Sequence, residues 1–137
     1  MGRILALDFG GKRTGVAITD SLNIIASGLA TIPTNELNDF LIDYIKKEKV
    51  ETVVIGQAIR KSGEASHIEK SIVPLINFLK KRFPTLKIER EDEGNTSQIA
   101  LETMIAGGVK KNKRSDKSLI DKVSATIILQ RYLERIQ

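Results

Sequence analysis

The sequence contains no cysteine, one histidine and few aromatic residues among its 137 positions. Without thiols the chain can form neither disulfides nor thiolate metal sites. Aromatic residues make up only 4% of the sequence, so base stacking cannot be the main mode of any nucleic-acid recognition. No segment resembles a signal peptide and no apolar run reaches 18 residues, which indicates a soluble, cytoplasmic protein with no membrane partner. The single histidine, His67, lies among polar residues, and we assign it no role.

The length and the hydrophobic content favour a single domain that covers residues 1–137. Hydrophobic residues make up 41% of the chain, which is enough for one core but hardly for two. The formal net charge of +5 is unevenly spread, because residues 109–122 alone contribute +4. This basic segment contains Lys110, Lys111, Lys113, Arg114, Lys117 and Lys122, offset by Asp116 and Asp121. Concentrated positive charge indicates a polyanionic partner, although a basic loop can also be a solvated surface.

The first half of the sequence predicts three strands and a helix. Residues 3–9 form a largely apolar run typical of a central strand, and two glycines supply a tight turn into a second strand over residues 14–20. A third strand is predicted over residues 26–32. Thr34 then has the position of an N-cap for a helix with one buried face. That face is formed by Leu37, Phe40, Leu41, Tyr44 and Ile45.

The second half alternates strands with helices. A β-branched run over residues 51–56 predicts a strand parallel to the first, and the polar residues 57–64 should emerge at the same sheet edge as Asp8. The helix that follows contains Pro74 inside its apolar pattern. Because proline removes a backbone donor and clashes with the preceding turn, we expect a kink or a split there. A fifth strand is predicted over residues 86–91.

Two helices are predicted after the fifth strand. Asn95 and Gln98 have capping-box spacing for the first, which Gly107 and Gly108 can end by adopting left-handed geometry. Residues 109–117 form a loop too charged to pack, and the last helix, from Ser118, is apolar around more than one face. The resulting order, βββαβαβαα, matches the α/β ribonuclease H-like architecture, a five-stranded mixed sheet with helices on both faces.

In this architecture three acidic residues are expected near the same edge of the sheet. Asp8 ends the first strand, Glu93 follows the fifth, and Asp121 lies in the first turn of the last helix. Phosphodiester hydrolysis needs charge neutralised on the scissile phosphate and a water activated for attack. Two divalent ions about 4 Å apart can do both when oxygen ligands hold them. Three carboxylates without histidine or cysteine suit Mg²⁺ or Mn²⁺ better than zinc, so we predict a catalytic metal site at these residues.

Each carboxylate also has a structural interpretation. Asp8 and its glycines could form an ordinary hairpin entrance or open a phosphate-binding loop. Glu93 could be a solvated residue at the end of a strand. Ser118 and Asp121 have the spacing of N-cap and N3 residues, so the carboxylate could serve the start of the last helix. The combination of the three residues is more informative than any one of them.

The opening sequence, LALDFGGKRTGVAITD, resembles the signature of the YqgF family, also called RuvX or Holliday-junction-resolvase-like proteins. In that family an apolar strand leads into D-x-G-x-K-R-x-G-x-A-x-x-D. The matching residues here are Asp8, Gly10, Lys12, Arg13, Gly15, Ala17 and Asp20. The resemblance continues through residues 53–56, 63–64, 92–93 and 121–130, and it covers nearly the whole chain in the right order.

The resemblance implies a ribonuclease H-like nuclease that processes the 5′ end of the 16S ribosomal RNA precursor, and it implies that Asp8, Glu93 and Asp121 are the metal-binding triad. An older inference from the fold assigned Holliday-junction resolution to the family.

Two positions depart from the family pattern. Gln57 and Ala58 follow Gly56 where the family has Gly-x-Pro, and Gly94 stands where the family has arginine after Asp-Glu. The missing guanidinium would remove a phosphate contact or a partner that orients the carboxylates. Arg60, Lys61 or Arg90 could compensate for it.

Three functions remain open from the sequence. The first is a Mg²⁺- or Mn²⁺-dependent nuclease acting on RNA or branched DNA, as a monomer or weak homodimer. Its backbone-gripping residues would be Lys12, Arg13, Lys110, Lys111, Lys113 and Arg114. The second is an RNA-binding ribosome-assembly factor without hydrolysis. The third follows from D-F-G-G-K-R-T-G, which also resembles the first phosphate loop of actin-like ATPases and sugar kinases. Those proteins need two such domains, so we expect no nucleotide binding here.

Overall fold

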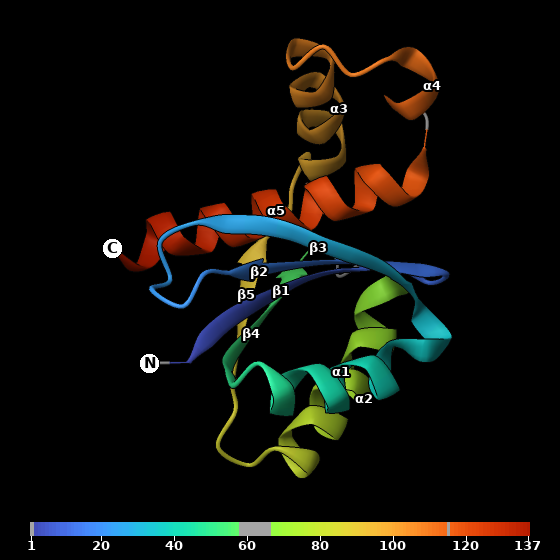
Figure 1. Ribbon diagram of the computed structural model, residues 1–137. Helices are drawn as coiled ribbons and strands as arrows, with labels where there is room; N and C mark the ends of the chain where they lie inside the picture. Colours follow the sequence, from blue (N-terminus) through green and yellow to red (C-terminus); the bar gives the residue numbers. More distant parts are fainter. Residues whose placement is uncertain (1, 58–66, 115) are drawn as a thin grey trace.

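The computed structural model describes residues 2–57, 67–114 and 116–137 and contains one five-stranded mixed sheet (Figure 1). Its strands are β1 (Arg3–Phe9), β2 (Arg13–Thr19), β3 (Ala26–Pro33), β4 (Val50–Gln57) and β5 (Lys87–Asp92). They are arranged in the order β3-β2-β1-β4-β5. The first three strands form an antiparallel meander, and β4 and β5 run parallel to β1. The five-stranded mixed sheet and the parallel pairing of β4 with β1 are as predicted, whereas the order of the strands within the sheet is seen only in the structure.

Helices cover both faces of the sheet, as predicted (Figure 1). A 3₁₀ turn (Thr34–Glu36) leads into α1 (Leu37–Lys47), which packs on one face beside α2 (His67–Arg82). The opposite face carries α5 (Lys117–Ile136). On the far side of α5 from the sheet lie α3 (Thr96–Ala106) and the short α4 (Lys111–Arg114). No helix within the described ranges is long and apolar enough to cross a membrane.

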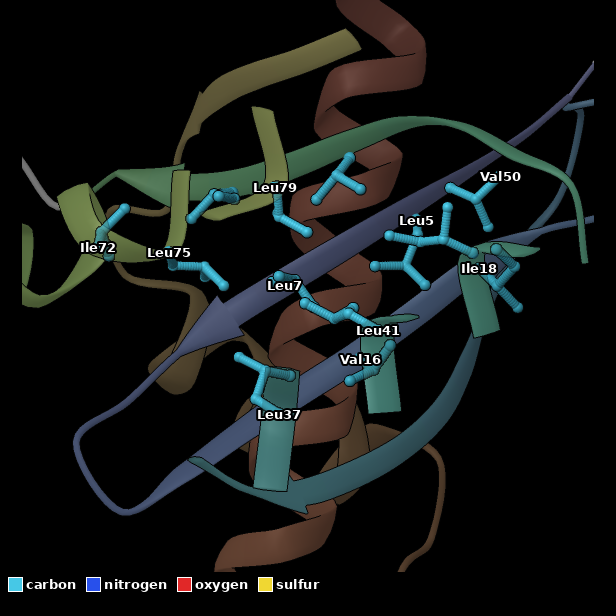
Figure 2. Packing of buried hydrophobic residues seen from close by; sticks show 13 residues of the cluster. Leu5, Leu7, Val16, Ile18, Leu37, Leu41, Val50, Ile72, Leu75 and Leu79 are labelled. Atoms are coloured by element: carbon cyan, nitrogen blue, oxygen red, sulfur yellow. The ribbon is translucent and has the colours of Figure 1, made fainter. Parts of the chain in front are cut away.

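Alternation along the central strands divides the core into two layers. Leu5 and Leu7 of β1 face the α1–α2 side, whereas Ile4 and Ala6 face α5. Figure 2 shows the larger layer, in which Leu5 and Leu7 lie among residues of α1 and α2. All four are at most 7% exposed, so β1 is buried on both faces. A strand buried on both faces provides a rigid support for a side chain at its carboxyl end.

Pro74 lies inside one continuous helix, so the predicted split is wrong. Proline at this position leaves the carbonyl oxygen of Lys70 without its helical donor. Both Pro74 and Lys70 are exposed, and water can therefore satisfy that carbonyl without a break in the helix. The apolar residues Ile72, Leu75 and Leu79 of the same helix are buried against the sheet, as the sequence pattern predicts.

The predicted helix caps on Thr34 and Asn95 are not formed. The Thr34 hydroxyl donates instead to the Gly10 carbonyl at 2.7 Å and lies 3.0 Å from the Thr14 hydroxyl, so it ties the β1–β2 turn to the end of β3. Asn95 adopts a left-handed conformation, with φ of 63°, and its side chain makes no capping bond to α3. Gln98 donates to Glu102 rather than taking part in a capping box.

Of the two glycines predicted to end α3 in left-handed geometry, only Gly108 adopts it. Gly108 has φ of 78°, while Gly107 has φ of −81°. Gly108 and Val109 donate to the carbonyls of Ile105 and Met104, which is the Schellman arrangement. The segment 109–117 is not wholly a loop, because it contains the single turn of α4.

Candidate active site

Asp8 is the penultimate residue of β1, between β2 and β4 in the sheet. Burial, a hydrogen bond with the Glu93 carboxyl and the charges of Glu93 and Asp121 together raise the pKa of Asp8 from 3.8 to about 8. Burial is the largest of these causes. The predicted triad therefore meets at one sheet edge, closely enough for each acidic group to affect Asp8.

Glu93 reaches Asp8 from the end of β5 by folding back over β4. Its backbone N–H donates to the Gln57 carbonyl at 3.1 Å, which continues the β4–β5 pairing past the end of β5. Its side chain lies against Gly56, where an added Cβ would stand 2.8 Å from the Glu93 Oε2 atom. The absence of a side chain at Gly56 therefore makes room for the Glu93 carboxylate next to the central strand.

Asp121 arrives on α5, which crosses the sheet at Gly15. Gly15 is the register partner of Asp8 on β2, and an added Cβ there would overlap the Asp121 carbonyl oxygen. This close approach of helix and strand requires glycine and brings the Asp121 carboxylate to the edge occupied by Asp8. Asp116, not Ser118, caps α5, because the Asp116 carboxylate accepts from the Ser118 N–H at 2.9 Å. Asp121 is thus not needed at the helix start.

Arg13 binds Asp121 through its Nε atom at 2.8 Å, in a partly buried ion pair. From the sequence we predict that Arg13 contacts the nucleic-acid backbone, whereas in this structure its guanidinium orients a carboxylate of the triad. The two residues are 108 positions apart, and no local motif links them. The pairing also explains how three acidic groups can lie together, since one is neutralised by Arg13 and two share a hydrogen bond.

The donor set has the chemistry of a magnesium or manganese site. Asp8, Glu93 and Asp121 offer hard oxygen ligands, which Mg²⁺ and Mn²⁺ prefer. As they stand, no group of three or more acidic, histidine or cysteine side chains within residues 2–57, 67–114 and 116–137 is gathered tightly enough to enclose a metal ion. The ion pair between Asp121 and Arg13 is consistent with this more open arrangement.

The turn that carries Glu93 is held by an arginine that sequence reasoning missed. Arg131 of α5 donates through Nη1 to the carbonyls of Asp92 and Gly94, each at 3.0 Å. The Gly94 N–H donates to the Asp92 carboxylate at 2.9 Å. A guanidinium therefore supports this turn from a different element, although Gly94 itself supplies none. No motif in the sequence marks Arg131.

Arg90 does not fill the role left open by Gly94. Its guanidinium makes two hydrogen bonds to Glu69, at 2.7 and 2.9 Å, and donates to the carbonyls of Ile55 and Gly56. These contacts join α2 to the end of β4. Arg60 and Lys61, the other two candidates, lie outside the described residues, as do Ala58, Gly63 and Glu64.

The predicted backbone-binding residues lie on two separate segments. Lys12 is exposed in the β1–β2 turn, and the α4 lysines, Lys110, Lys111 and Lys113, are exposed around α4. Arg114 is the last residue of α4, and its side chain lies outside the described part of the structure. A surface cavity of about 340 Å³ joins α4 to α5 and is lined by Thr31, Lys113, Asp116, Ser118, Leu119 and Lys122. This cavity begins within one helical turn of Asp121.

The chain resembles known proteins over almost its whole length. A protein of Christiangramia forsetii is 53% identical over 97% of this chain and 98% of its own length. One of Phocaeicola vulgatus is 49% identical over 98% of this chain and 96% of its own length. Both carry the name "Putative pre-16S rRNA nuclease".

The solved structures support the fold. Thermus thermophilus RuvC, in complex with a Holliday junction substrate, matches with a TM-score of 0.62 over 100% of this chain and 98% of that chain. The sequence identity is 11%, so this likeness establishes the ribonuclease H-like fold alone. The model of the family described as "RuvX: Holliday junction resolvase" matches residues 2–135. The chain therefore belongs to the RuvX family, also called YqgF, as the resemblance of its opening strand and turn predicted.

Proposed function

We propose that this protein is a metal-dependent endonuclease that hydrolyses phosphodiester bonds in structured RNA, at the 5′ end of the 16S ribosomal RNA precursor. The observation that carries the proposal is the meeting of three carboxyl groups at one sheet edge, where burial, together with Glu93 and Asp121, raises the pKa of Asp8 to about 8. Perturbed acidic clusters of this kind are typical of catalytic sites. The names of the relatives supply the substrate, and the family membership supplies the nuclease class.

In the proposed mechanism Asp8, Glu93 and Asp121 would hold Mg²⁺ or Mn²⁺. A bound ion of this type neutralises charge on the scissile phosphate and activates a water molecule. Asp8 stands on a strand buried on both faces, which fixes its position. Arg13 orients the Asp121 carboxylate, and Gly56 leaves the space into which the Glu93 side chain folds. The protein would thus supply oxygen ligands from fixed positions in the fold before the substrate arrives.

The basic residues would position the nucleic acid against these carboxylates. Lys12 and the α4 lysines are exposed, and lysine contacts phosphate oxygens without reading the base sequence. The cavity between α4 and α5 adds Lys122, which follows Asp121 directly. A backbone that runs along this cavity would therefore pass beside the carboxylate cluster. Such recognition by charge and shape suits a folded RNA substrate.

Cleavage of a structured RNA containing the 5′ leader of the 16S precursor tests the proposal. Asp8→Asn should abolish cleavage in Mg²⁺, because a neutral amide cannot replace the carboxylate as a metal ligand. Asp43→Asn, on the exposed surface of α1, is the matched control and should cleave as fast as the parent protein. Equal cleavage by the Asp8 variant and the parent would refute the mechanism.

Two other functions are distinguished by the same set of measurements. The family description favours a four-way DNA junction as the substrate. If the protein cleaves that junction faster than the RNA, the proposed substrate would be branched DNA and not RNA. The open arrangement of the triad favours an assembly factor that binds RNA without cutting it. In that case the parent protein would show no cleavage, and Asp8→Asn would bind RNA with unchanged affinity.

A further inference from the structure

An exposed apolar surface lies at the end of the sheet opposite the carboxylates. It comprises Leu22, Ile24 and Ile25 of the β2–β3 loop together with Ile136 near the end of α5, and we call it the distal patch. Leu22, Ile24, Ile25 and Ile136 are 68%, 64%, 61% and 52% exposed. A surface cavity of about 450 Å³, lined in part by Ile24, Ile25 and Leu133, separates the loop from the helix.

The loop that displays these side chains is held in one conformation by hydrogen bonds. The Asp20 carboxylate accepts from the backbone N–H groups of Ile24 and Ile25 at 2.7 and 2.9 Å. Asn23 has a φ of 56°. Its side chain accepts a hydrogen bond from the Thr19 hydroxyl at 2.6 Å and donates one to the backbone carbonyl of Gly2 at 3.0 Å. Because the loop is already ordered, its apolar side chains can be buried against another surface at little further entropic cost.

Charges of opposite sign flank the distal patch. Glu134 lines the cavity on one side, near the carboxyl end of α5, where the helix dipole adds negative potential. On the other side of the loop a cavity of about 250 Å³ is lined by Arg3, Ser21, Lys47, Glu48 and Lys49. Arg3 pairs with Glu48 at 3.5 Å, whereas neither lysine forms an ion pair with any other described residue. The patch therefore has an acidic flank and a basic flank.

We propose that the distal patch binds a second copy of this chain in a two-fold symmetric dimer. A two-fold axis through the β2–β3 loop would place apolar side chains against the same side chains of the partner, and the acidic flank of each copy against the basic flank of the other. A partner without this arrangement of charges would match only one flank. The proposal is independent of the nuclease function, because the patch and the carboxylates lie at opposite ends of the sheet.

The distal patch is smaller than a standard protein–protein interface. Four side chains that are each more than half exposed form a patch of roughly 300–600 Å², the range of the largest apolar patch on an ordinary monomer. A stable interface of standard size buries about 800 Å² on each partner. The dimer should therefore be weak and reversible, with a dissociation constant of roughly 1 μM to 1 mM.

Sedimentation velocity of the full chain at low salt, from roughly 10 μM to 1 mM, tests the proposal. The parent protein should associate as its concentration rises. Ile24→Asp should weaken association at least about tenfold, because it introduces a charge at the centre of the apolar contact. Val73→Asp is the matched control, since Val73 is 54% exposed on α2, and should leave association unchanged. A parent protein that stays monomeric, or two variants that behave alike, would overturn the proposal.

An exchange of charges tests the symmetry of the contact. Glu134→Lys and Lys47→Glu should each weaken the dimer, because each places like charges opposite one another in both halves of the interface. An equimolar mixture of the two variants should associate as the parent protein does, since the mixed dimer pairs opposite charges at both positions. A mixture that stays monomeric would exclude the two-fold pairing. RNA cleavage by Ile24→Asp should equal that of the parent, which separates this proposal from the proposed function.

Discussion

Because the pKa of Asp8 is raised in the folded protein, the protein should become less stable as the pH rises. The pKa of Asp8 is 3.8 in the unfolded chain and about 8 in the folded protein, chiefly because of burial, with Glu93 and Asp121 adding to it. Between these values the folded state binds more protons than the unfolded state. The free energy of unfolding must therefore fall as the pH rises from about 4 to about 8, by at most about 1.4 kcal/mol per pH unit.

Asp8→Asn removes this dependence, because the amide does not titrate and can still donate a hydrogen bond to Glu93. From pH 5 to pH 8 the parent protein should lose up to about 4 kcal/mol of stability relative to the variant, with most of the loss complete by pH 8. The proton is shared with Glu93, so the loss belongs to the pair of carboxyl groups. Asn at this position should therefore stabilise the protein most at high pH.

Urea unfolding in metal-free buffer, repeated at intervals between pH 5 and 9, measures the difference between the two proteins. All other titratable groups are common to both, so subtracting one profile from the other cancels their contributions. Asp43→Asn, on exposed α1, should follow the parent profile throughout. Parallel profiles for the parent and Asp8→Asn would show that Asp8 is not held in a cluster of acidic groups, and the reasoning for the site would fail.

Two further predictions concern the approach of α5 and the grip on nucleic acid. Gly15→Ala should lower the free energy of unfolding by about 1–3 kcal/mol and impair cleavage, since an added methyl group overlaps the Asp121 carbonyl oxygen. Gly11→Ala, where an added Cβ meets no atom within 4 Å, should change neither urea unfolding nor cleavage. Replacing the α4 lysines by glutamine should reduce the slope of log affinity for structured RNA against log salt by up to about 2–3, as measured by fluorescence anisotropy; an unchanged slope would remove α4 from the binding surface.

The parts of the fold that depend on hydrophobic periodicity could be predicted from the sequence. The prediction for β1 agrees with the structure at both ends, and the strand directions follow from the turn and helix lengths between strands. The helix caps were harder to predict, because the side chains of Thr34 and Asn95 can form hydrogen bonds with several nearby groups. The Thr34 hydroxyl binds Gly10, 24 residues away, and this contact exists only after β3 has paired with β2.

In the candidate site, too, local sequence patterns could be interpreted, whereas contacts between distant parts of the chain could not. Asp8 could be singled out because a buried strand followed by glycines marks a rigid sheet edge. Arg13 and Arg131 could not be placed correctly, since each binds a group from a distant part of the chain, Asp121 in one case and the turn at Gly94 in the other. Long side chains on different elements meet only in the folded structure, so the spacing of residues in the sequence does not predict such pairs.

The most direct test of the proposed metal site is a crystal structure of the protein grown with Mn²⁺, with the ion located by its anomalous scattering. We predict manganese at the sheet edge, coordinated by oxygen atoms of Asp8, Glu93 and Asp121 at roughly 2–2.5 Å. Binding of the ion should also move Asp121 toward Asp8 relative to the arrangement in which it pairs with Arg13. Manganese bound elsewhere, or a site in which Asp8 takes no part, would contradict the assignment of these carboxylates as the catalytic metal ligands.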